Sequence, residues 1–63
     1  MERQCDAVRR LHRHHAGNAD VIIAALARGL AAGEISRRSN KHDWSDETYA
    51  RALYGNYSRK GLL

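Results

Sequence analysis

Proline and phenylalanine are absent from the sequence, and cysteine occurs once, at Cys5. A single cysteine excludes an internal disulfide framework, so we expect a cytoplasmic protein whose fold does not depend on oxidation. The longest apolar run, residues 21–27, is far shorter than the roughly 20 residues that a membrane-spanning helix needs. The charged N-terminus also lacks the apolar stretch of a signal peptide. The sequence therefore predicts a soluble chain with no membrane partner.

Strand signals are lacking as well, because no segment alternates apolar and polar residues between turn signals. The predicted fold class is all-α, a small three- to four-helix bundle. The 63 residues allow one hydrophobic core, so residues 1–63 are expected to form a single helical domain. A chain this short buries a small share of its surface, which makes a homodimer a reasonable support for the fold. Many alanines and no phenylalanine favour closely packed helices over a deep ligand pocket.

Two helices are predicted in the first half of the chain. Residues 3–15 place Ala7, Val8 and Leu11 on one helical stripe, with charged residues opposite. Residues 19–28 are apolar on most sides, which predicts a central helix that neighbours cover from more than one direction. Gly29 is expected to interrupt this second helix.

Two further helices are predicted in the second half. The segment from Glu34 to Ser39 is interpreted as a short helix. The last helix has the clearest start, with Ser45 as N-cap and Thr48 three residues later, and should run to about Arg59. Gly61 is the expected C-cap, after which the two terminal leucines can fold back onto the helices.

Cations exceed anions, since eleven Lys and Arg stand against seven Asp and Glu, for a formal net charge of +4. Most of these cations are arginines, whose planar guanidinium suits phosphate groups and base edges. The charge makes nucleic acid a candidate partner, while a purely solubilising role remains the alternative.

The stretch DVIIAALARGLAAGEISRR, residues 20–38, resembles the LuxR-type helix-turn-helix, with its apolar helix, Ala-Arg-Gly-Leu and Glu-Ile. The later SDETY and RKGL are similar to that family's Ser-x-x-Thr-Val opening of the recognition helix and its closing Lys-Leu-Gly. The resemblance covers residues 20–62, although the link from Ile35 to Thr48 is longer than in the family. It implies a helix-turn-helix-like region over about 19–60 and a small DNA-binding transcriptional regulator.

On that interpretation, the helix from Ser45 to Arg59 enters the major groove, and Arg51 is the leading base reader. Arg37, Arg38 and Lys41 would contact phosphates and fix the register of binding. The acidic pair Asp46 and Glu47 would oppose phosphate unless it serves only to cap the helix. The full set of predicted DNA-binding residues is Arg37, Arg38, Lys41, Thr48, Arg51, Ala52, Ser58 and Arg59.

The exposed Arg9, Arg10 and Arg13 of the first helix would either add phosphate contacts or take part in a dimer. The rival hypothesis is a small protein-binding module, such as a phage-like inhibitor or adaptor of the transcription machinery, with Trp44 and Tyr54 as anchors.

Cys5 and the histidines lack the spacing of a closed zinc site, so no metal or other cofactor is expected. His15 is expected at the edge of the core, with His12 and His14 in solvent. The sequence shows no paired carboxylates, activated nucleophile or nucleotide loop, and an enzyme is not expected.

Overall fold

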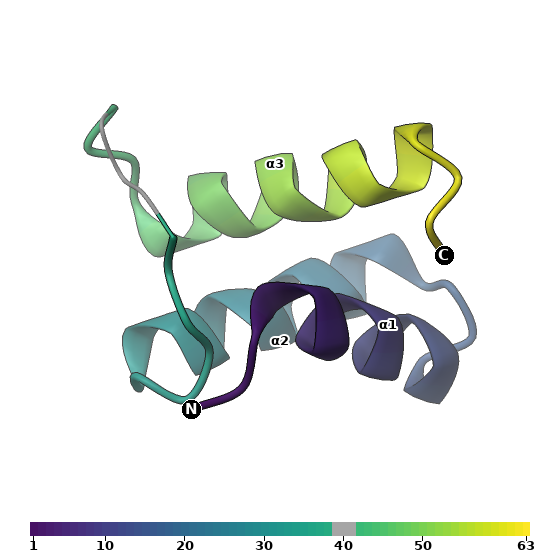
Figure 1. Ribbon diagram of the computed structural model, residues 1–63, viewed down its shortest axis with the longest axis horizontal. Helices are drawn as coiled ribbons and strands as arrows, with labels where there is room; N and C mark the ends of the chain where they lie inside the picture. Colours follow the sequence, from purple (N-terminus) through teal and green to yellow (C-terminus); the bar gives the residue numbers. More distant parts are fainter. Residues whose placement is uncertain (39–41) are drawn as a thin grey trace.

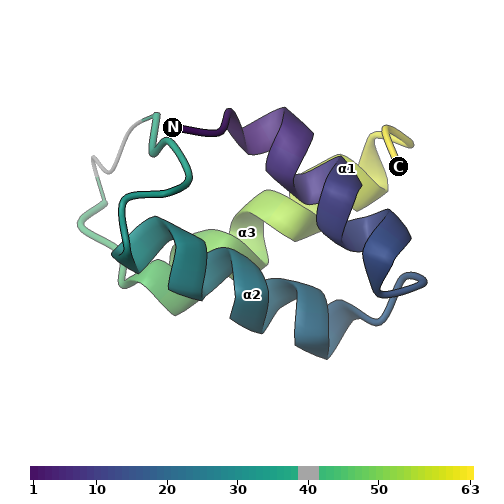
Figure 2. The same ribbon diagram turned by 90° about the horizontal axis from the view of Figure 1, so that it is seen from below.

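A computed structural model describes residues 1–38 and 42–63. It contains three helices, α1 (Gln4–His14), α2 (Ala19–Ala31) and α3 (Asp46–Arg59), and the all-α prediction is confirmed. In Figure 1, α3 lies across one face of the pair formed by α1 and α2. Figure 2 shows the same arrangement from below, with α1 and α2 to either side and α3 behind them. Within the described ranges, no helix is both long and apolar enough to span a lipid bilayer.

The core forms where the apolar stripes of the three helices meet. Val8, Ile22 and Leu26 are fully buried, and Ala7 and Ala50 are small enough to let the helices approach closely. α2 contacts both other helices, which confirms its predicted central position. α1 approaches α3 less closely, and the two are linked mainly through side chains.

Gly29 does not interrupt α2, and the prediction that the helix stops before it is wrong. The helix continues to Ala31, and Gly29 is buried within it. A Cβ at position 29 would lie 2.4 Å from Cδ1 of Ile35 and 2.8 Å from its Cγ1. The glycine is therefore required by the side chain that packs on it. The turn is made instead at Gly33, where φ is +75°, and the Glu34 N–H donates to the Gly29 carbonyl at 2.9 Å.

The short helix expected over residues 34–39 is absent from the described part, residues 34–38. Ile35 instead pairs with Glu2 in an isolated parallel β-bridge. The Glu2 N–H donates to the Glu34 carbonyl at 2.9 Å, and the Ser36 N–H donates to the Glu2 carbonyl at 2.8 Å. α2 and α3 are thus joined by residues 32–45 rather than by the three- or four-residue turn of a helix-turn-helix.

The N-cap and the last residue of α3 agree with the prediction, whereas the C-cap is Lys60 rather than Gly61. The Ser45 hydroxyl accepts a hydrogen bond from the Thr48 N–H at 3.3 Å, which caps the first turn. At the other end, Gly61 has a φ of +69°, and the Leu62 N–H donates to the Tyr57 carbonyl at 3.1 Å. The Leu62 carbonyl in turn accepts from Arg9 Nε at 3.4 Å, so the C-terminal segment folds back onto α1.

Asn18 occupies the N-cap position of α2, with an extended backbone, but its side chain makes no capping hydrogen bond. Asp20 lies in the first turn of α2, where the helix dipole favours a negative charge.

Candidate nucleic-acid interface

The outward side of α3 carries most of the predicted DNA-binding residues. Thr48, Arg51, Ser58 and Arg59 are exposed, and Ala52 is half-buried at the edge of the same side. Successive residues of a helix are about 100° apart, which brings these positions onto one surface. Figure 1 shows α3 on the outside of the fold, with α1 and α2 on its other side. The helical period therefore predicted the shared surface.

Arg51, the leading candidate base reader, is paired with Glu47. Its Nη2 lies 3.2 Å from the Glu47 carboxylate, one helical turn earlier, and both side chains are largely exposed. An exposed pair at this spacing contributes only about 0.3–0.5 kcal/mol, so Arg51 can exchange its partner at small cost.

The neighbouring acid, Asp46, has a different role. Asp46 accepts a hydrogen bond from Arg37, and this ion pair ties the segment before α3 to its first turn. The Arg37 guanidinium also lies over the Tyr49 ring, 4.7 Å from its centroid, and its side chain is only 25% exposed. Arg37 is thus committed to holding the start of α3.

Arg38 and Lys41 were predicted to bind phosphate together with Arg37. Arg38 is exposed, and its backbone N–H donates to the Tyr49 hydroxyl at 3.2 Å, which leaves its guanidinium at the surface. Lys41 lies outside the described residues. Of the two predicted phosphate contacts that the structure describes, Arg37 is held by Asp46 and Tyr49, and Arg38 is exposed.

Ion pairing leaves an uneven distribution of positive charge. Among the described residues, four arginines pair with carboxylates: Arg3 with Asp6, Arg10 with Glu2, Arg37 with Asp46 and Arg51 with Glu47. Within the same ranges, Arg9, Arg13, Arg59 and Lys60 have no carboxylate partner. These four side chains, which we name the basic end, belong to the second half of α1, the last turn of α3 and the residue after α3.

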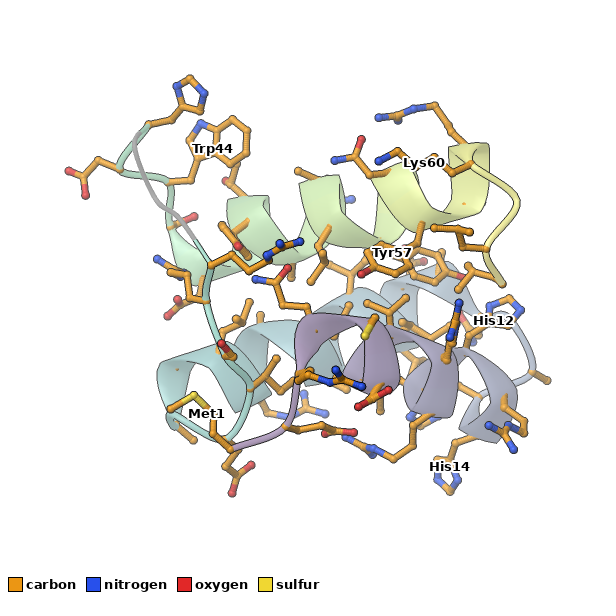
Figure 3. The ribbon with its side chains drawn as sticks, viewed as in Figure 1. Met1, His12, His14, Trp44, Tyr57 and Lys60 are labelled. Atoms are coloured by element: carbon orange, nitrogen blue, oxygen red, sulfur yellow. The ribbon has the colours of Figure 1, made fainter. Side chains whose placement is uncertain are left out.

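Figures 1 and 2 show α1 and α3 finishing at the same end of the fold, and Figure 3 places His12 and Lys60 there.

Sequence reasoning grouped Arg9 and Arg13 with Arg10. Arg10 differs because it forms two hydrogen bonds with Glu2, at 2.8 and 2.9 Å. The Arg10 guanidinium lowers the pKa of the Glu2 carboxyl below its ordinary value, chiefly through this hydrogen bonding.

Tyr54 is part of the core, and its expected role as an exposed anchor is wrong. It is 8% exposed, and its hydroxyl is hydrogen bonded to His12 Nδ1 at 2.9 Å. His12 is consequently half-buried rather than free in solvent, because this contact closes α1 onto α3. Trp44 does remain accessible, at 40% exposed, with its ring stacked on His42 at a centroid distance of 4.9 Å.

Metal ligands do not converge in the described ranges, where no group of three His, Cys, Asp or Glu side chains is arranged to hold an ion. Cys5 lies beside Asp6, with Sγ 3.8 Å from its carboxylate, and His12 is engaged with Tyr54.

Comparisons of the chain with protein-family models, with curated proteins and with solved structures find no match. The LuxR-type resemblance therefore stays a prediction, and the candidate interface rests on the residues of this chain alone.

Proposed function

We propose that this protein binds double-stranded DNA as a small transcriptional regulator, with the outward side of α3 in the major groove. The observation that carries the proposal is the uncovered side of α3, which ends directly at the basic end. The helix provides base contacts there, and the clustered cations provide phosphate contacts.

The dimensions of α3 support this mode of binding. Its 14 residues give a helix of about 21 Å, and the major groove, about 12 Å wide, admits such a helix. Ala52 and Gly55 are small, so the helix axis can approach the base edges. Arg51 would leave Glu47 to donate two hydrogen bonds to a guanine, and Glu47 could then accept from a neighbouring cytosine amino group.

The basic end supplies the affinity that does not depend on sequence. Arg9, Arg13, Arg59 and Lys60 can each displace a counterion from a phosphate, which gives a salt slope of about −3.6 if all four engage the duplex. Arg38 is kept as a predicted phosphate contact and Arg37 is not, since Arg37 would first have to leave both Asp46 and Tyr49.

The proposal is tested by fluorescence anisotropy of a labelled random duplex at several salt concentrations. We expect the double variant Arg9→Ala, Arg13→Ala to lower the salt slope by about 1.8, one counterion-release increment per lost phosphate contact. Arg3→Ala is the control, because Arg3 is an exposed cation at the start of α1, outside the basic end and the outer side of α2. Absence of duplex binding at low salt would overturn the proposal. It would also be overturned if the control variant lowered the salt slope, per charge removed, as much as the double variant does.

A homodimer through the outer side of α2 would raise the affinity of so small a module. Asp20 and Arg28 lie on this side, four residues before and after the exposed Ala24, and the structure as described pairs neither with another charge. Antiparallel packing of two copies about Ala24 would bring each Asp20 to the second copy's Arg28. Sedimentation equilibrium should show that Asp20→Arg weakens the dimer and that adding Arg28→Asp restores it.

A protein-binding module is the second candidate function, and the accessibility of Trp44 is the observation that favours it. On this alternative, Trp44→Ala would abolish capture of a partner from the transcription machinery, and Arg9→Ala with Arg13→Ala would leave that capture unchanged.

A further inference from the structure

A groove lies along the flank of α3 opposite to Arg51. It has a volume of about 280 Å³ and is bounded by α3, the start of α1 and the segment that precedes α3. Its walls hold three aromatic rings and two cations, and none of the described residues that line it is a carboxylate. The side chains that matter for its chemistry are Trp44, Tyr49, Tyr57, Asn56, Arg38 and Lys60.

The aromatic wall is held in place before any ligand arrives. The Tyr49 hydroxyl accepts a hydrogen bond from Gln4 Nε2 at 2.6 Å and another from the Arg38 backbone N–H at 3.2 Å. Tyr57 is half-buried against the core, and Figure 3 shows it between α3 and α1. Because these rings are already ordered, a ligand would lose little affinity to immobilising them.

The ends of the groove carry its accessible groups. Figure 3 shows Trp44 at the start of α3 and Lys60 at its end, on the same side of the helix. The Trp44 indole is 40% exposed, and the cations Arg38 and Lys60 are exposed as well. The groove thus combines aromatic surface with positive charge along the length of the helix.

This combination is the chemistry that unpaired nucleotides require, namely aromatic faces for the base and cations for the phosphate. We propose that the groove binds an unpaired nucleotide, with the base against the Trp44 indole and its phosphate at Arg38, which like Trp44 precedes α3. The inference deepens the DNA-binding function proposed above and rests on it. Asn56 offers an amide NH₂ that can donate to a base edge, while its Oδ1 accepts a hydrogen bond from Arg59.

The groove adjoins the proposed duplex surface, because Ala52 belongs to both the outward side of α3 and the groove wall. A duplex on α3 would therefore bring an overhang or a bulged base to the groove. The expected target is a duplex next to an unpaired nucleotide, rather than a continuous duplex.

Trp44 makes this inference directly measurable, because it is the single tryptophan of the chain. We expect a short oligothymidine strand to quench Trp44 fluorescence, since a base stacked on the indole contacts it directly. Thymidine monophosphate tests whether the groove binds a free nucleotide or one within a strand. Quenching by both the oligothymidine strand and the mononucleotide indicates a site for free nucleotides, and quenching by the strand alone indicates a site for single strands. Inorganic phosphate should not quench.

Variants separate the groove from the duplex surface. Trp44→Ala should weaken binding of a labelled oligothymidine strand roughly 5- to 150-fold, the range for loss of one base–aromatic stack. Trp44→Phe should retain most of the affinity, because it keeps an aromatic face. Val21→Ala is the matched control, since Val21 is an exposed apolar residue on α2, outside the groove.

The outcomes distinguish this inference from the function on which it rests. Duplex binding without any binding of the strand or the mononucleotide would overturn the groove assignment and leave the duplex proposal standing. Failure of every nucleic-acid probe would overturn both. Tighter binding of an acidic peptide than of the strand would also overturn the nucleotide assignment and would favour a protein partner at Trp44.

Discussion

Replacing Gly29 by alanine tests how the segment after α2 is held. Alanine is favoured over glycine in a helix interior by about 1 kcal/mol. Against this gain, the new Cβ would lie 2.4 and 2.8 Å from side-chain atoms of Ile35, and overpacking of this kind costs about 1–3 kcal/mol. The balance predicts that Gly29→Ala destabilises the protein by about 0–2 kcal/mol, the difference between the two effects.

The sign should reverse when Ile35 is shortened. Ile35→Ala leaves only its Cβ, which is 3.8 Å from the new atom, an ordinary contact distance. In that background Gly29→Ala should stabilise the protein by about 1 kcal/mol, because only the helix-propensity gain remains. The coupling energy between the two substitutions is therefore expected to be about 1–3 kcal/mol.

Urea denaturation of the four proteins in this double-mutant cycle measures the coupling. Ile35→Ala itself costs about 2–5 kcal/mol, and Ile35→Val, at about 0.5–1.5 kcal/mol, can replace it if the alanine variants melt too early. If Gly29 instead made a turn, it would need a left-handed backbone conformation. Gly29→Ala would then destabilise the protein whether residue 35 is Ile or Ala, and the coupling energy between the two positions would be zero. That result would refute the packing of Ile35 on Gly29.

Three other predictions follow from local contacts. Ala16 has a φ of +52° after α1, so Ala16→Gly should raise the free energy of unfolding by about 1 kcal/mol and Tm by about 4–8 °C; a lower Tm would contradict this. Because Arg10 lowers the pKa of Glu2, the Glu2–Arg10 ion pair stabilises the fold fully above the unfolded-state pKa of Glu2. This stabilisation is lost as the pH falls through the lower folded-state pKa. Thermal melts at acidic pH should show the loss, and the Glu2→Gln variant should not. Arg51→Ala should cost about 1–3 kcal/mol of DNA binding at one base position in a sequence-variant panel, whereas a uniform loss at all positions would indicate a phosphate contact.

The parts of the fold that sequence reasoning predicted are those governed by nearby residues. α3 was placed correctly because its cap, Ser45, acts on Thr48 only three residues away. The segment over residues 34–38 was mistaken for a helix because its backbone partner is Glu2, at the other end of the chain. Gly29 was misread for a related reason, since its role depends on the side chain of Ile35, which returns to α2 only after the turn.

The candidate site also has features that follow from nearby residues and features that follow from distant ones. The shared outward side of α3 follows from the helical period, so it could be predicted. The pairing of Arg37 with Asp46 depends on how the chain folds back on itself, and so does the hydrogen bond from Arg9 to the Leu62 carbonyl after α3. Sequence reasoning therefore named these cations as candidates but could not tell which of them the fold neutralises.

Two hydrogen bonds between α1 and α3 hold side chains beside the two proposed binding surfaces. Gln4 binds the Tyr49 hydroxyl near the start of α3, and His12 binds the Tyr54 hydroxyl farther along it. The first holds a wall of the groove, and the second holds the turn of α1 that carries Arg9 and Arg13 against α3. Because α1 approaches α3 less closely than α2 does, these two hydrogen bonds are direct links between α1 and α3, beside the core that all three helices share. If both proposals hold, substitutions at Gln4 or His12 should therefore change binding without removing any group that contacts the nucleic acid.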